Sequence, residues 1–218
     1  MRFTDKHKRA AENYNQVCSL YEPIDHRHAS DILVSAFPDE AIELCSALLE
    51  FRITDTDIRT PGGSESPIPK KIKESLGSIG WRPGRLTAQQ VVTVDGKEVE
   101  TYPETHEIDY LKGRVAFDIE WNSKDQTFDR DLYAFRTFFD LNRISVAILL
   151  TRSDELEDYF KTLGALKDKY GTTRAVKAKY GASTTHMGQL IWRLDQGRGG
   201  GCPILALGIT KKLIVTGR

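Results

Sequence analysis

The chain has 218 residues, of which 39% are hydrophobic and 28% charged, with a formal net charge of zero. This length is enough to bury one substantial core. The first residues lack the apolar stretch of a secretory signal, and the longest strongly apolar run, Ile144 to Leu150, is too short to cross a bilayer. Cys18, Cys45 and Cys202 are widely spaced and odd in number. We therefore expect a cytoplasmic globular protein with reduced core thiols, no disulfide frame or zinc site, and no membrane partner.

Charge is unevenly distributed along the chain. Residues 95–131 contain 11 acidic and 5 basic residues, a balance of −6, whereas residues 161–198 contain 8 basic and 2 acidic residues, a balance of +6. An acidic patch can hold cations and a basic stretch can hold an anion. Two solvated faces would account for the same segregation.

The N-terminal third has the pattern of helices. Residues 30–53 have apolar side chains at helical spacing, interrupted near Pro38, where Pro-Asp-Glu suits a new helix start. Residues 60–67 have the composition of a loop. Residues 68–81 form a short basic amphipathic pattern that ends at glycine.

From Gln89 the apolar period changes to two, which predicts strands. Residues 89–102 suit a hairpin with Asp95-Gly96 at its turn, and residues 106–121 suit a second hairpin that turns around Lys112-Gly113. The remaining expected elements are a helix at 125–143, a buried strand at 144–151 followed by a helix from Ser153, a helix at 183–194, and strands at 202–210 and 212–217.

This order predicts an α/β fold in which helices flank a mixed central sheet of about five or six strands. We expect one domain over residues 1–218, with an N-terminal helical part at about 1–85 and a sheet core at about 86–218.

The segment "GRVAFDIEWN", Gly113 to Asn122, raises the question of function. One face of this predicted strand is apolar, and the other face carries Ala116, Asp118, Glu120 and Asn122. If Leu111 faces Arg114, then Asp109 lies opposite Ala116, and Glu107 lies opposite Asp118.

Directly opposed residues share a face, so this pairing brings Asp109 to within roughly 5–8 Å of Asp118 and Glu120. Like charges at that distance raise one another's pKa unless a proton or a cation lies between them. Mg²⁺ accepts a few carboxylate ligands and keeps other sites for water and phosphate oxygens. The face therefore suits a magnesium site. The alternative is a solvated sheet face on which Lys112, Arg114 or Lys124 pairs with the acids.

The spacing D-x₈-D-x-E from Asp109 to Glu120 also fits the PD-(D/E)-x-K nuclease pattern. Five segments carry a resemblance to a known family: "DHRHASDIL", "SPIPKKIKESLGSIGW", "IDYLKGRVAFDIEWNSKDQTFDRDL", "YGASTTHMGQL" and "DQGRGGGCPILALGI". The chain resembles the type II restriction endonucleases related to BglII and BstYI. These enzymes cut palindromes centred on GATC. The resemblance covers most of the chain and implies a PD-(D/E)xK core and Mg²⁺-dependent hydrolysis of double-stranded DNA.

The resemblance also assigns roles in the reaction. It implies that Asp109, Asp118, the backbone carbonyl of Ile119 and Glu120 bind the metal, and that the three carboxylates are catalytic. Glu120 stands where the wider superfamily has lysine and the closest relatives have glutamine, so it could be a third metal ligand or a general base. Ile108 stands where the pattern has proline.

Base recognition is implied for Asn122 and Ser123, just past the catalytic strand, and for Ser183, Thr184 and Thr185. Asn can bond adenine bidentately in the major groove. Lys177 and Lys179 suit phosphate contacts. A polar strand end and a helix N-cap are the plain structural alternatives for the two recognition blocks.

A palindromic target implies a homodimer, because protein symmetry mirrors site symmetry. The family analogy adds a four-base 5′ overhang and a cognate methyltransferase that protects the same site. Three other functions stay open: a structure-selective or repair nuclease, a DNA-binding module with a degenerate catalytic site, and a carboxylate-rich enzyme for a small substrate.

Overall fold

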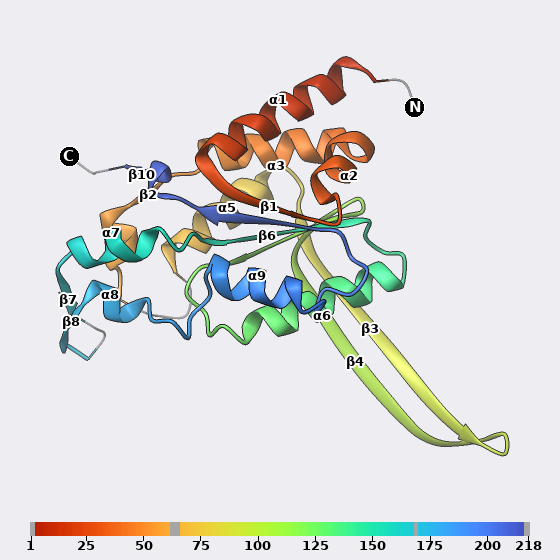
Figure 1. The fold of residues 1–218 in the computed structure, drawn as a ribbon. Coiled ribbons are helices and arrows are strands. Elements are labelled where there is room, and N and C mark those ends of the chain that lie inside the picture. The colour runs from red at the N-terminus through yellow and green to blue at the C-terminus, as the bar shows by residue number, and fades with distance from the viewer. Residues whose placement is uncertain (1–2, 62–65, 168–169, 216–218) are drawn as a thin grey trace.

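The computed structural model describes residues 3–61, 66–167 and 170–215 (Figure 1). The helices are α1 Asp5–Leu20, α2 Ala29–Ala36, α3 Pro38–Glu50, α4 Asp55–Arg59, α5 Pro67–Ser78, α6 Thr127–Asp140, α7 Leu156–Thr162, α8 Val176–Lys179, α9 Met187–Asp195 and the 3₁₀ turn η1 Lys211–Leu213. The strands are β1 Tyr21–His26, β2 Ile53–Thr54, β3 Arg82–Val94, β4 Lys97–Lys112, β5 Val115–Glu120, β6 Val146–Arg152, β7 Ala165–Lys167, β8 Thr173–Ala175, β9 Ile204–Ile209 and β10 Ile214–Val215.

Six of these strands form one mixed sheet in the order β1-β9-β6-β5-β4-β3. The three central strands β9, β6 and β5 run parallel to one another, while β1, β4 and β3 are antiparallel to their neighbours. Every residue of β5, β6 and β9 is buried, as expected for parallel strands covered on both faces. The predicted α/β fold with a mixed central sheet is confirmed.

Helices cover the two faces of the sheet with separate hydrophobic cores (Figure 1). On one face, α1, α3 and α5 pack against Phe117, Ile148 and Leu207. On the other face, α6 and α9 pack against Ala116 and Leu149. Because Asp118 and Glu120 share the face of Ala116 in β5, they lie beneath α6 and not on an open sheet surface.

The hairpin β3–β4 is much longer than the pattern predicted and projects beyond the helices as an arm (Figure 1). Asp95 and Gly96 form its turn with φ of 51° and 76°, the positive values that a primed hairpin turn requires. The predicted turn position is therefore confirmed. Val91, Val94 and Val99 on the arm are exposed.

Two predictions about strands were wrong. Tyr21–His26 is not helical but forms the edge strand β1, where Pro23 is tolerated because only one side of the strand pairs. The strand expected at residues 212–217 is mostly the 3₁₀ turn η1 and the short β10, which pairs with β2 outside the main sheet. The Thr210 hydroxyl caps this turn by accepting from the Lys212 N–H at 3.3 Å, which leads the chain away from β9. Residues 216 and 217 lie outside the described part.

Two helix starts also differ from the prediction. The helix expected from Ser183 begins at Met187, because the preceding residues are used in backbone pairing with the segment after β5. The helix expected from Ser153 begins at Leu156, although the Ser153 hydroxyl does accept from the Glu155 N–H at 3.3 Å. Most of the loop expected at 60–67 lies outside the described residues. Over the ranges that are described, no helix combines the length and apolar character of a bilayer-spanning segment.

Candidate active site

The pairing of β4 with β5 differs from the predicted register. The structure pairs Tyr110 with Phe117 and Lys112 with Val115, so the turn consists of Gly113 and Arg114. The expectation that Asp109 lies opposite Ala116 was therefore wrong. Gly113, the first residue of this two-residue turn, has a φ of +55°. Such a turn needs a positive φ at its first position, which glycine adopts without the strain that a side chain would cause.

A bulge in β4 places Asp109. Between the pairs Arg82–Leu111 and Gly84–Ile108, two steps along β3 match three along β4, so β4 carries an extra residue at 109–110. The side-chain alternation breaks here: Ile108 packs in the core beneath α6, whereas Tyr110 packs in the core of the opposite face. The bulge aims the Asp109 backbone at the next strand, where its N–H donates to Asp118 Oδ1 at 2.7 Å.

Three of the predicted catalytic residues come together by this route. Asp118 and Glu120 are 3% and 7% exposed, while Asp109 lies more openly at the edge. A cavity of about 440 Å³ is lined by Asp109, Asp118, Arg130 and Asp131 and extends to Glu107. Glu107 itself is exposed, with its carboxylate 3.7 Å from Arg85.

Burial and mutual repulsion raise the pKa values of these acids. Desolvation, followed by the charges of Asp109 and Asp131, raises the pKa of Asp118 well above its usual range. Desolvation also raises the pKa of Glu120, although Ser123 and Arg130 lower it in part. Desolvation also raises the pKa of Asp109, and it outweighs the charge of Arg130 and the backbone of Ile119, which lower that pKa. The acids therefore favour a bound proton or a cation.

Two functional candidates escaped the sequence analysis, and both come from α6. Asp131 is 3% exposed, and desolvation, followed by the charge of Glu120, raises its pKa to about 8. The Arg130 guanidinium lies 2.9 Å from Asp131 Oδ1 and 3.6 Å from Glu120 Oε1. The sequence could have identified Asp131 as a buried acid, because it lies on the apolar stripe of this helix. It follows Phe128 by three residues and precedes Phe135 by four.

The chemistry of this cluster fits a hard divalent cation. All of its donors are carboxylate or carbonyl oxygens, and Asp131 Oδ2 is buried with no hydrogen-bond partner in the structure as described. Within the described ranges, no three His, Cys, Asp or Glu side chains are already arranged as a metal-binding group. Arg130 pairs with two of the acids, and both Arg130 and Lys73 bring positive charge to the cluster.

The first predicted recognition segment continues directly from the catalytic strand. Asn122 is half-buried, and its Oδ1 atom is buried without a hydrogen-bond partner in the described residues. The Ser123 hydroxyl lowers the pKa of Glu120, while the Ser123 carbonyl accepts from the Thr185 N–H at 2.9 Å. Ser123 thus links a candidate catalytic acid to the second recognition segment.

Ser183, Thr184 and Thr185 form that second segment, and backbone bonds hold it beside the first. Thr184 forms an isolated antiparallel bridge with Lys124, and the Asp125 N–H donates to the Ser183 carbonyl at 3.0 Å. Thr185 is fully buried, and its hydroxyl has no partner in the part of the chain that is described. The structure therefore brings the two predicted recognition segments together.

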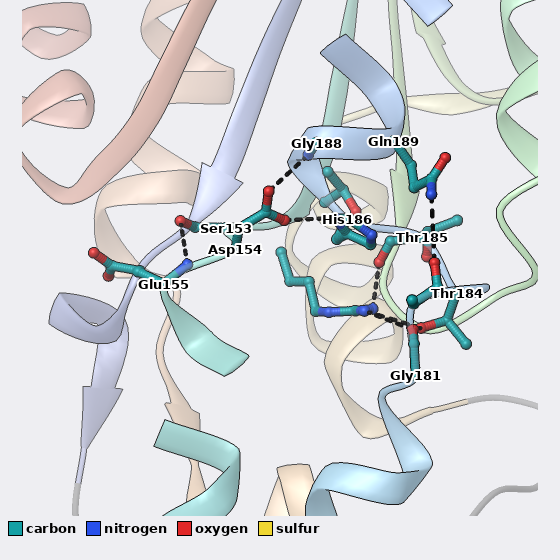
Figure 2. A network of polar contacts seen from close by, with 12 residues as sticks. Ser153, Asp154, Glu155, Gly181, Thr184, Thr185, His186, Gly188 and Gln189 are labelled. Carbon is teal, nitrogen blue, oxygen red and sulfur yellow. Dashed lines mark hydrogen bonds and ion pairs between the residues drawn. The ribbon is translucent and has the colours of Figure 1, made fainter. Parts of the chain in front are cut away.

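Arg152, at the end of β6, bonds both segments. Its buried guanidinium donates to the Trp121 carbonyl at 3.3 Å, to Thr184 Oγ1 at 2.9 Å and to the Thr185 carbonyl. Desolvation lowers the pKa of Arg152 to about 10, and none of these three bonds goes to a carboxylate. Next to it, His186 Nδ1 lies 2.5 Å from Asp154 Oδ1, and Asp154 also accepts from the Gly188 N–H at the start of α9 (Figure 2).

The two predicted phosphate-binding lysines make contacts within the protein. Lys177 lies 2.8 Å from the Glu157 carboxylate. The Lys179 ammonium donates to the carbonyls of Ile58 and Thr60 at 3.1 and 2.6 Å, and desolvation lowers its pKa to about 8. Lys179 thus fixes α8 against α4 and the residue that follows it.

Comparison with known proteins identifies the family. Residues 21–209 match the restriction endonuclease BglII/BglIII family, a span that runs from β1 to β9 and includes the whole six-stranded sheet. The comparison with curated proteins gives no match. The chain belongs to the BglII/BglIII family of restriction endonucleases and is thus a type II site-specific deoxyribonuclease.

Proposed function

We propose that this enzyme hydrolyses both strands of a palindromic duplex with GATC at its centre, in a Mg²⁺-dependent reaction. Restriction endonucleases of this kind bind double-stranded DNA and generally use a divalent metal ion. The observation that carries the proposal is the cluster of Asp109, Asp118 and Glu120, three acids with raised pKa values, of which Asp109 and Asp118 line one cavity. Such acids are poised to exchange protons for a hard cation.

The residues proposed to hold Mg²⁺ are Asp109, Asp118, the Ile119 carbonyl and Glu120. When bound, the ion would acidify a water molecule and offset negative charge on the scissile phosphate. Glu120 has a second possible role as the base that takes the proton of the attacking water. Ser123, which lowers the pKa of Glu120, favours the ionised carboxylate that this step needs.

Base recognition is proposed for the two segments that Arg152 joins. Asn122 brings a buried carbonyl oxygen without a partner in the described residues, which can accept from a base donor. Backbone bonds hold Ser183, Thr184 and Thr185 beside the segment of Asn122 and Ser123. Lys177 is proposed to contact phosphate by exchanging its exposed ion pair with Glu157. Lys179 would have to release two carbonyls to do the same, so its contribution is expected to be smaller.

The biological context follows from the palindrome. A homodimer would place one active site on each strand, with the chain acting as a single domain in the cytoplasm. Staggered cuts would leave four-base 5′ overhangs. A methyltransferase that modifies the same site would protect host DNA, with no direct binding between the two enzymes.

The test is digestion of unmethylated phage DNA by the purified protein, with Mg²⁺ or with EDTA, followed by sequencing of the ends. Discrete fragments with GATC overhangs, formed only with Mg²⁺, are the expected result. A smear would favour a structure-selective or non-specific nuclease on the same core. Asp118→Asn, which keeps the size of the side chain, serves as the matched inactive control.

A second candidate function is a DNA-binding module that no longer cuts. Arg130 favours it, because this cation already neutralises Glu120 and Asp131. That reading predicts a gel shift on a GATC duplex with intact DNA in Mg²⁺, Mn²⁺ and Co²⁺. Cleavage in any of these metals excludes it.

A further inference from the structure

Arg130 holds an unusual place for an arginine of the first turn of α6. Its side chain is 75% exposed, yet its guanidinium reaches the mouth of the carboxylate cavity. Both of its hydrogen bonds, from Nε at 3.1 Å and from Nη2 at 2.9 Å, end on the single oxygen Oδ1 of Asp131. In the described structure Nη1 makes no hydrogen bond to the protein, so part of the guanidinium remains available to a ligand.

A structural arginine on the same face of the sheet looks different. Arg193 of α9 is buried, and its guanidinium bonds Asp129 through two nitrogens and Asp125 through one, at 3.1–3.2 Å. These contacts fix α9 against α6 and its preceding turn. Arg130 instead makes a one-oxygen contact that opens to solvent, which is the arrangement expected of a group that changes partners.

Arg130 lies among acids for which a divalent cation would compete. Asp109, Asp118 and Asp131 line the cavity, and the Glu120 carboxylate lies 3.6 Å from the Arg130 guanidinium. Desolvation raises the pKa of each of these four acids. Despite partial desolvation, which lowers it, the pKa of Arg130 is raised by Asp131 and Glu120, so the guanidinium stays charged. An incoming divalent cation would repel Arg130 and compete with it for Glu120.

We propose that Arg130 is a catalytic residue that exchanges Glu120 for a non-bridging oxygen of the scissile phosphate when DNA and the cation enter the site. The inference rests on the proposed nuclease function. In that reaction the water oxygen bonds to phosphorus and gives its proton to a base. The phosphorus–O3′ bond breaks, and O3′ takes up a proton from solvent, which leaves a 3′-hydroxyl and a 5′-phosphate.

Negative charge grows on the phosphoryl oxygens during this step. A guanidinium placed beside them stabilises that charge, and its planar donors suit phosphate geometry. Removing one such donor from an active site typically slows the reaction by about 10²–10³-fold.

The same geometry predicts an opposite effect on cation binding. Without DNA, Arg130 competes with the divalent ion for Glu120 and Asp131, so its removal should tighten binding. An exposed ion pair of this kind is worth up to about a fivefold change in affinity. A residue that only supported the fold would instead weaken cleavage and cation binding together.

The experiment compares full-length wild type, Arg130→Ala, Arg130→Lys and the control Arg136→Ala. Arg136 lies on the same helix and pairs with Asp140 at 3.4 Å, outside the carboxylate cavity. Single-turnover cleavage with Mg²⁺ measures the chemical step. Calorimetric titration with Ca²⁺ alone, without DNA, measures cation affinity.

The expected result is a loss of about 10²-fold or more in cleavage rate for Arg130→Ala, with Ca²⁺ binding equal to or tighter than wild type. Arg130→Lys should recover part of the rate, and Arg136→Ala should match wild type. If Arg130→Ala does not fold, Arg130→Gln, which keeps a hydrogen bond to Asp131, is measured by the same two assays.

Two outcomes overturn the inference alone, with wild type active: an Arg130→Ala variant whose cleavage rate falls by less than about 10²-fold, or one that loses cleavage and Ca²⁺ binding together. An inactive wild type would instead overturn the proposed nuclease function, and the role of Arg130 would fall with it. The wild-type digest therefore distinguishes the two failures.

Discussion

Replacing Arg152 by methionine tests how the two recognition segments are held together. Methionine keeps much of the volume of the stem and removes every donor. Four bonds from the charged guanidinium are lost, to the carbonyls of Trp121, Gly181 and Thr185 and to Thr184 Oγ1. At about 1.5–3 kcal/mol for each bond to a charged group, the gross loss is about 6–12 kcal/mol.

Part of that loss is offset because the buried charge itself is unfavourable. Desolvation lowers the pKa of Arg152 from 12.5 to about 10, which corresponds to about 3 kcal/mol. The expected net decrease in the free energy of unfolding is therefore about 3–9 kcal/mol. For a chain of this size, each kcal/mol lowers the melting temperature by about 2–4 °C, so it should fall by about 6 °C or more.

The assays are urea unfolding followed by circular dichroism, and cleavage of a GATC-centred duplex against a duplex with one base pair changed in the centre. Discrimination should fall by about tenfold or more, since one correct base contact is worth about 1–3 kcal/mol. Arg143→Met, at an exposed position before β6, is the control and should change neither quantity. A stability change under about 1 kcal/mol with discrimination intact would refute the role of Arg152.

Three further predictions concern the site. Asp109→Asn should abolish cleavage while sparing DNA binding, whereas Asn122→Ala should weaken discrimination more than non-specific affinity; equal loss of both in gel shifts would count against the recognition role of Asn122. The buried carboxyls have raised pKa values in the folded state, so the metal-free protein should lose stability as pH rises from about 4 towards 8. Asp131→Asn should flatten this dependence in thermal melts, and an unchanged slope would show that Asp131 does not contribute. Ca²⁺ should raise the melting temperature of wild type more at pH 8.5 than at pH 6, because protons and the cation compete for the same oxygens; a full shift in Asp118→Asn would place the ion elsewhere.

Local patterns identified most of the elements and the central chemistry. Alternation in β5 and helical spacing in α6 depend on residues close in sequence, so they can be read without a fold. Asp95-Gly96 likewise marks its own turn, because few residues adopt positive φ at low cost. The family resemblance, now supported by the match over residues 21–209, depended on such short blocks in order.

Register was harder to read, because it depends on which residues form a turn. The choice between Lys112-Gly113 and Gly113-Arg114 shifts the pairing and so changes the expected partner of Asp109. The bulge that aims the Asp109 N–H at Asp118 arises from the pairing of β4 with β3, and a single-strand pattern does not contain it.

The sequence by itself determined the kind of chemistry: an α/β sheet, an acidic strand and two polar segments suited to base contacts. Only the tertiary structure decided which groups meet. Arg130 and Asp131 reach the cluster because α6 packs on β5, and Arg152 joins Trp121 to Thr185 across more than 60 positions of the chain. Contacts of this kind depend on how helices and strands pack, which no local period encodes.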